Sequence, residues 1–351
     1  MSNKKKLVVV GFGGMGWWHT THAKESDVVE LAGIYDIDPS RLDVAVEFGI
    51  KPYKTLDEVL NDPEVDFVTI ATPNDHHCEL AVAALKAGKH VICEKPVVMN
   101  SEELELCIAT AKECGRLFSV HQNRRWDTDK IRIAELHASG SMGKTINIES
   151  RVHGSRGIPG DWRKVKSEGG GMVLDWGVHL IDQAIMIMGD EKITSVYARL
   201  DNITNNEVDD GCHIVLTFES GVTYTIEVQT SNFIELPRFY MRGEKGTAII
   251  EGWDSPMKVV IKKDGVEKDA VPIRAQQGLT KTMAPRDGDT TITYLIEEPK
   301  VDVHDYYRNF CRAMDGIEPQ IVTHDQMRRV MKVMENAFIS AEKNEVIKIT
   351  I

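Results

Sequence analysis

The sequence lacks a long run of apolar residues. Its longest apolar stretches, such as residues 8–10 and 172–174, are far shorter than the roughly 20 residues that a membrane-spanning helix needs. A strand pattern begins directly after the lysines at positions 4–6, which leaves no room for a signal peptide. We therefore expect a cytoplasmic protein without a membrane partner.

Positive charge is also scarce. The chain has 42 Lys and Arg against 54 Asp and Glu, a formal net charge of −12, and no segment outside residues 4–6 concentrates positive charge. This balance argues against nucleic acid as a partner, because proteins bind that polyanion mainly through Lys and Arg. At 351 residues, 42% of them hydrophobic, the chain is long enough for about two packed domains. A small molecule is the expected substrate.

The cysteines form no metal-binding or redox motif. The sequence has no Cys-x-x-Cys pair, and no histidine cluster of metal-ligand spacing lies near a cysteine. Such scattered residues are typical of reduced thiols that fill a core in a reducing compartment. We therefore predict neither a redox role nor a metal site for the six cysteines, which are Cys78, Cys93, Cys107, Cys114, Cys212 and Cys311.

Short β-branched runs alternate with helical patterns over the first part of the chain. Such alternation is typical of a doubly wound parallel sheet with helices on both faces. We predict an α/β domain at residues 1–122. Its strands are expected at 7–11, 28–36, 65–72, 90–96 and 116–121, and helices at 77–88 and 101–115.

The pattern changes after residue 122, where we predict a second, α+β domain at 123–351. Residues 212–228 alternate apolar and polar side chains on both sides of Ser220 and Gly221, which indicates an antiparallel hairpin with one covered face. The last residues of the chain could pack back on the first domain. Helices are expected at 127–138, 171–189, 302–315 and 323–342, with strands near 144–153 and 346–351.

A GxGxxG motif follows the first predicted strand. Gly11 permits a tight turn, Gly13 lets a pyrophosphate approach the backbone, and Gly16 allows close packing of the next helix. Asp36, 20 residues beyond Gly16, would bind ribose hydroxyls and repel a 2′-phosphate, so NAD is favoured over NADP, although Arg41 could accommodate that phosphate. The motif predicts a Rossmann domain whose cofactor contacts also include Phe12, Gly14 and Met15.

Three further residues have side chains that suit the oxidation of an alcohol. Lys95 lies in CEKP at the carboxyl end of a predicted strand, the sheet edge where ligands bind. Asp175 and His179 stand four residues apart on one predicted helix, so both project from the same face. The alternatives are a solvated helix face for this pair and a surface ion pair between Lys95 and Glu94.

The order and spacing of several motifs resemble the Gfo/Idh/MocA oxidoreductase family over nearly the whole chain. These motifs are GFGGMG at 11–16, ATPNDHH at 71–77, CEKP at 93–96, GDWR at 160–163 and GGGMVLDWGVHLIDQ at 169–183. HQNRRWD at 121–127 is similar to the scyllo-inositol dehydrogenase branch. The resemblance implies that the second domain contains a large, mostly antiparallel sheet that forms the interface of a homo-oligomer, a dimer, tetramer or larger.

The resemblance also implies that Lys95, Asp175 and His179 form the catalytic group. Chemically, His179 can take the hydroxyl proton, Lys95 can stabilise alkoxide-like oxygen, and Asp175 can bind a neighbouring hydroxyl. Hydride transfer to NAD then needs no metal. The further cofactor contacts implied by the resemblance are Thr72, Pro73, Asn74, His77, Glu94, Lys95, Trp162 and Arg163.

The polar residues expected around the reacting carbon favour a sugar, cyclitol or glycoside as substrate. One option is oxidation of the glucosyl 3-hydroxyl of a glycoside, with Trp17, Trp18 and Trp126 stacking on the aglycone. Two other functions stay open: a NAD-dependent glycosidase that acts by transient oxidation and elimination, and a NAD-binding regulator without catalysis. The predicted substrate contacts are Lys95, Asn123, His153, Arg156, Arg163, Asp175 and His179.

Overall fold

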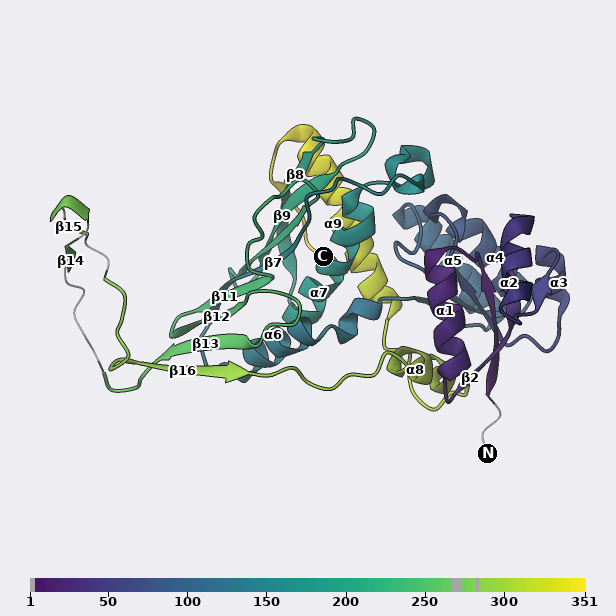
Figure 1. The fold of residues 1–351 in the computed structure, drawn as a ribbon, viewed down its shortest axis with the longest axis horizontal. Coiled ribbons are helices and arrows are strands. Elements are labelled where there is room, and N and C mark those ends of the chain that lie inside the picture. The colour runs from purple at the N-terminus through teal and green to yellow at the C-terminus, as the bar shows by residue number, and fades with distance from the viewer. Residues whose placement is uncertain (1–3, 267–272, 275, 279, 282–283) are drawn as a thin grey trace.

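The chain forms two domains that lie beside each other in Figure 1. The computed structural model describes residues 4–266, 273–274, 276–278, 280–281 and 284–351. The first domain surrounds a six-stranded sheet, and the second contains a nine-stranded sheet with helices packed on one face (Figure 1). The predicted fold class, an α/β domain followed by an α+β domain, is confirmed.

All strands of the six-stranded sheet are parallel, in the order β3-β2-β1-β4-β5-β6. This order reverses between β1 and β4, and ligands of open parallel sheets bind at such a point, beyond the carboxyl ends of the strands. The short edge strand β3 was not predicted. The strands are β1 (Lys5–Val10), β2 (Val29–Tyr35), β3 (Pro52–Tyr53), β4 (Phe67–Ile70), β5 (His90–Cys93) and β6 (Phe118–Val120).

The helices of the first domain connect consecutive strands, as expected for a doubly wound sheet. The longest, α5, has Asn100 as its N-cap and ends at Gly115, whose φ of 62° is in the left-handed region that favours glycine. The buried residues of this helix are Leu104, Cys107, Ile108, Thr110 and Ala111. The helices are α1 (Gly14–Glu25), α2 (Pro39–Glu47), α3 (Leu56–Asn61), α4 (His77–Lys86) and α5 (Ser101–Cys114).

The nine-stranded sheet of the second domain is antiparallel except for the parallel pair β7 and β10. The predicted hairpin is formed by β9 and β10. A separate two-stranded sheet, β14 (Ile273–Arg274) with β15 (Thr280–Lys281), lies at the end of the arm at the left of Figure 1. The large sheet runs in the order β16 (Thr291–Ile296), β13 (Met257–Lys262), β12 (Gly246–Ile250), β11 (Phe239–Gly243), β7 (Thr145–His153), β10 (Thr223–Gln229), β9 (Gly211–Phe218), β8 (Ile193–Asp201) and β17 (Ile347–Lys348).

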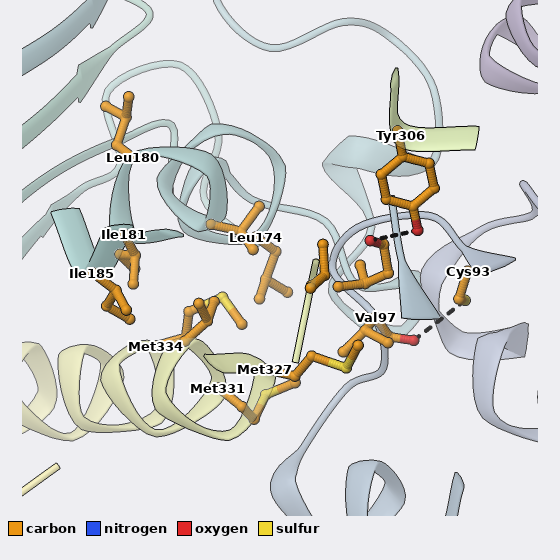
Figure 2. Packing of buried hydrophobic residues seen from close by; sticks show 14 of the residues in the cluster. Cys93, Val97, Leu174, Leu180, Ile181, Ile185, Tyr306, Met327, Met331 and Met334 are labelled. Atoms are coloured by element: carbon orange, nitrogen blue, oxygen red, sulfur yellow. Dashed lines mark hydrogen bonds between the residues drawn. The ribbon is translucent and has the colours of Figure 1, made fainter. Parts of the chain in front are cut away.

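Three helices cover the large sheet: α6 (Thr128–Ser139), α7 (Val178–Met188) and α9 (His324–Lys343). Figure 2 shows methionines of α9, such as Met331 and Met334, facing Ile181 and Ile185 of α7. The stretch Lys166–Met188 is long and apolar enough by composition to cross a membrane, but 83% of its most apolar window is buried inside the protein. Such burial is typical of a core helix in a globular protein.

The predicted helix over 171–189 is interrupted at its start. Residues Val173–Gly177 form a π-helical turn, and the α-helix α7 begins only at Val178. Single π-helical turns are frequently found at functional sites. This turn contains Asp175.

The C-terminal region differs from the prediction. The helix α8 (Asp305–Met314) packs on the first domain, where Tyr307 is fully buried and its ring lies 6.3 Å from that of Phe67. The last residues instead form β17, in which Ile347 pairs with Val196 of β8. The expectation that the last residues pack on the first domain is therefore wrong, because the exposed edge of β8 offers them unpaired backbone groups.

Candidate active site

The glycine motif has the geometry that a dinucleotide requires. Gly11 has a φ of +93°, and a Cβ there would lie 2.6 Å from the carbonyl oxygen of Ala71. A Cβ on Gly16 would lie 1.9 Å from the carbonyl oxygen of Gly11, so this glycine allows helix and strand to approach. A Cβ on Gly13 would have no atom within 4 Å, because this residue faces open space. The three glycines thus have three different functions.

The open space in front of Gly13 is a cavity of about 770 Å³, hereafter the cofactor cavity. Asp36 lines this cavity, and its carboxylate accepts hydrogen bonds from the backbone N–H groups of Phe12 (2.6 Å) and Asp38 (2.9 Å). The fixed carboxylate and the open backbone at Gly13 fit the ribose and the pyrophosphate of a dinucleotide. The predicted cofactor residues that line this cavity are Gly11, Gly13, Gly14, Met15, Asp36, Arg41, Thr72, Pro73, Asn74, Glu94, Lys95, Trp162 and Arg163.

Three predicted cofactor residues do not line the cofactor cavity. Phe12 is buried and contributes its backbone N–H to Asp36, while Gly16 allows close packing. His77 is also buried, with its ring nitrogens 3.0 Å from the carbonyl oxygen of Thr72 and 2.9 Å from that of Pro96. His77 therefore connects two loops at the cavity wall, since its ring reaches a carbonyl oxygen on each side.

Lys95 and Asp175 meet across the domain boundary. The Lys95 ammonium lies 2.8 Å from both the backbone oxygen and Oδ1 of Asp175, and Arg163 Nε lies 3.3 Å from Oδ2. Burial alone would raise the pKa of Asp175, but the charges and hydrogen bonds of Lys95 and Arg163 outweigh it and hold the pKa below its ordinary value. Asp175 is therefore an ionised, fixed acceptor between two cations.

His179 lies one helical turn beyond Asp175 and is only 5% exposed. Burial, together with the positive charges of Lys95 and Arg124, holds the pKa of His179 well below its ordinary value. Its Nδ1 is buried without a hydrogen-bond partner among the described residues. At neutral pH this imidazole is uncharged and can accept a proton, as a general base must.

A second cavity of about 610 Å³, hereafter the substrate cavity, begins at Asp175. Of the predicted substrate residues, Asp175, His153 and Arg156 line it. Lys95 and Arg163 line the cofactor cavity, Asn123 lines another cavity, and the buried His179 is not among the residues that line these three cavities. Nδ1 of His153 accepts hydrogen bonds from the Asn232 side chain (2.9 Å) and from the Leu236 backbone (3.2 Å). His153 is thus fixed by the segment that contains Asn232 and Leu236. The lining side chains that sequence reasoning missed include Arg124, Trp176 and Trp253.

A buried network surrounds Glu94, the residue before Lys95. Its Oε1 lies 2.7 Å from Nε2 of His19 and 2.8 Å from Nδ1 of His121. Burial lowers the pKa of His19 to about 4. Burial alone would raise the pKa of Glu94, but the two histidines outweigh it and hold that pKa well below its ordinary value.

The residue types of this network would also suit a metal ion. A tetrahedral ion about 2.1 Å from each ligand atom would, however, hold the ligand atoms more than about 3 Å apart. The nitrogen-to-oxygen distances of 2.7 and 2.8 Å are those of hydrogen bonds. We therefore interpret the network as a support that fixes the strand end carrying Lys95, whose backbone N–H also lies 3.2 Å from Oε2 of Glu94.

Comparison with known proteins agrees with this architecture. Residues 5–122 match the family model described as "Oxidoreductase family, NAD-binding Rossmann fold", and residues 131–249 match the "GFO/IDH/MocA C-terminal domain". An uncharacterised oxidoreductase of Schizosaccharomyces pombe is 31% identical over 86% of both chains. The Bacillus subtilis scyllo-inositol 2-dehydrogenase (NADP(+)) IolW is 27% identical over 97% of this chain and 95% of its own.

A solved structure is more similar still. The structure of an NAD-binding protein from Listeria innocua matches 99% of both chains with a TM-score of 0.94 and 45% sequence identity. The match covers both the six-stranded and the nine-stranded sheet. Together with the two family models, it shows that the chain belongs to the Gfo/Idh/MocA family of oxidoreductases and carries an NAD-binding Rossmann domain.

Proposed function

We propose that the protein oxidises a secondary alcohol of a sugar, cyclitol or glycoside, with NAD preferred over NADP. The observation that carries this proposal is the contact between Lys95 and Asp175. Lys95 lines the cofactor cavity and Asp175 lines the substrate cavity, and their side chains lie 2.8 Å apart. A substrate hydroxyl beside this pair would therefore lie next to the cofactor cavity.

The three catalytic residues have complementary roles in this proposal. The bound nicotinamide supplies the acceptor for the hydride. Neutral His179 takes the proton of the hydroxyl, Lys95 stabilises the developing negative charge on that oxygen, and ionised Asp175 accepts a hydrogen bond from a neighbouring hydroxyl. A complete set of this kind favours catalysis over a purely regulatory role, because a sensor has no need for a general base.

The preference for a polyhydroxylated ring rests on the substrate cavity and on a relative. Asp175, Arg124 and Arg156 offer one acceptor group and several donors, which suits a ring with many hydroxyls better than an apolar alcohol. IolW is named a scyllo-inositol 2-dehydrogenase (NADP(+)). Within this class we propose a pyranose-like ring, and the glucosyl 3-hydroxyl of a glycoside as the reacting group.

A substrate panel tests the proposal. The purified protein is mixed with NAD or NADP and with glucose, scyllo-inositol, myo-inositol or an aryl glucoside, and the absorbance of reduced nicotinamide is followed. We expect turnover of at least one polyol, faster with NAD. Absence of turnover with every polyol and both cofactors would contradict the proposal. Release of the aglycone without net NADH would indicate the alternative, a NAD-dependent glycosidase.

We also propose a cytoplasmic homo-oligomer. The support is the large sheet, because helices pack on one face and the side chains that alternate with the buried ones, such as Thr223, Thr225 and Glu227 of β10, are only half-buried. A second copy could cover these side chains. Sedimentation velocity measures the mass in solution directly. A monomer at micromolar concentration would contradict this assembly.

A further inference from the structure

A third cavity, of about 410 Å³, lies beside the substrate cavity and shares Trp253 with it. Its aromatic lining comes from distant parts of the chain: Trp18 of α1, Trp126 after β6, Trp253 after β12 and Tyr306 of α8. Two of the three tryptophans predicted to stack on an aglycone, Trp18 and Trp126, thus line this cavity. Trp17 does not line this cavity, because its ring packs on Phe48 instead, with 4.6 Å between centroids.

The rings of the third cavity are held by their neighbours. Trp18 stacks on His22 with 3.8 Å between ring centroids, and Trp126 meets Tyr306 edge-on at 6.0 Å. Trp253 is 42% exposed, yet the Arg238 guanidinium lies 4.4 Å from its ring centroid. Rings that are already oriented lose little conformational freedom when a flat ligand stacks on them. The third cavity therefore offers preorganised faces.

The charge of the third cavity favours an uncharged ligand. Of its four carboxylates, Asp127 lies 3.2 Å from Arg124, Asp129 lies 3.0 Å from Arg238, and Glu298 lies 3.7 Å from Arg132. These arginines offset most of the negative charge, so a cationic ligand gains little there. The remaining carboxylate, Asp254, is exposed and could accept a hydrogen bond from a phenolic hydroxyl.

We propose that the third cavity binds an uncharged aromatic group joined to the sugar, the aglycone of an aryl glycoside. The sugar would lie beside Asp175 in the substrate cavity, and the glycosidic bond would pass Trp253, which lines both cavities. This inference rests on the proposed oxidation of a sugar ring. It narrows the substrate class from any polyol to glycosides with an aromatic aglycone.

The test compares phenyl β-glucoside with methyl β-glucoside, which share the sugar and differ in the aromatic ring. Since an aromatic contact favours the phenyl compound, we expect its kcat/KM in the native protein to be higher by about 2- to 10-fold. Trp126→Leu should abolish most of this preference. Trp17→Leu is the matched control, and it should keep the preference.

A binding measurement keeps the two proposals separate. Isothermal titration gives the dissociation constant of phenyl β-glucoside for the native protein and for Trp126→Leu, whether or not turnover occurs. About tenfold weaker binding in Trp126→Leu supports the aromatic subsite. Equal binding, an equal loss in Trp17→Leu, or tighter binding of a cationic aminoethyl β-glucoside would overturn it. Absence of turnover despite binding would count against the proposed oxidation alone.

Discussion

The cofactor cavity and the substrate cavity are built in different ways. Much of the cofactor cavity is formed by backbone at the carboxyl ends of neighbouring parallel strands, as at Gly11 and Gly13, and by one strand-end carboxylate, Asp36. The substrate cavity is lined mainly by side chains from separate segments, such as Arg124, Asp175 and Trp253. A binding site formed by backbone keeps its geometry when side chains are substituted. A binding site formed by side chains can accept a new substrate after a few substitutions.

The pair Lys95 and Asp175 is where the two cavities meet, and breaking it should have the largest effect. Lys95→Met removes the cation near the developing alkoxide and one of the two partners of the Asp175 carboxylate. We expect kcat to fall by about 10³-fold, since positioned charged groups at an alkoxide contribute effects of this order. NAD binding, measured by fluorescence titration, should persist.

The control for Lys95→Met is Lys86→Met, a change at an exposed residue of α4. This variant should keep the native kcat. If Lys95→Met retained most of the native activity, the proposed role of the Lys95–Asp175 pair between the two cavities would be contradicted. If instead it lost NAD binding and stability together, its role would be structural.

Substitutions of the glycines test the role of backbone geometry at the cofactor cavity. Gly16→Ala would place a Cβ 1.9 Å from the Gly11 carbonyl oxygen, so helix α1 would have to shift away from β1. We expect a loss of about 3 kcal/mol in the free energy of unfolding, as for severe overpacking. Gly14→Ala, whose Cβ would have no atom within 4 Å, is the matched control and should stay near native stability. Urea unfolding of both variants measures this, and equal losses would contradict the account.

The buried histidine behind Lys95 predicts a pH dependence of stability. Burial lowers the pKa of His19 from 6.5 to about 4, so between these values the unfolded chain binds more protons than the folded protein. Stability should therefore fall as the pH is lowered through this window, by up to about 3 kcal/mol from this group alone. Denaturant unfolding at pH 7 and pH 4.5 measures the change. His19→Gln should lessen it, and an unchanged slope in that variant would contradict the assignment.

The smallest effect concerns the choice of cofactor. Asp36→Ser removes the carboxylate that would repel a 2′-phosphate, and Arg41 lines the same cavity. We expect the ratio of kcat/KM for NADP to that for NAD to rise by about tenfold, the scale of one hydrogen bond to a charged group. The exposed Asp43→Ser is the control. If the native protein already preferred NADP, the role assigned to Asp36 would be wrong.

The difference between the backbone-built cofactor cavity and the side-chain-built substrate cavity also explains which features the sequence could predict. The parallel strands, the GxGxxG turn and Asp36 leave local patterns, because each follows from neighbouring residues in the chain. Lys95, Asp175 and His179 were predicted from chemistry and from family resemblance, and the structure places Lys95 against Asp175. His121 could have been found, since it directly follows β6, the strand beside β5, and the ends of parallel strands share one edge.

Other residues could not have been found in this way. Trp253 lies in a loop after β12, and nothing in its neighbourhood indicates that tertiary packing brings it beside Trp176, with 6.0 Å between ring centroids. The π-helical turn at Val173–Gly177 cannot be predicted from the sequence either, because the apolar pattern of the helix continues through it. Long-range packing, and not local preference, decides both features.

The central claim is that side chains of the second domain perform chemistry on a substrate held next to the cofactor of the first. The most direct test is His179→Ala, with the dissociation constant of NAD and the rate of NAD reduction by a polyol substrate measured on the same preparation. The account predicts unchanged NAD binding and a rate lower by about 10²- to 10⁴-fold, the usual contribution of a general base. A variant that reduces NAD as fast as the native protein would contradict it.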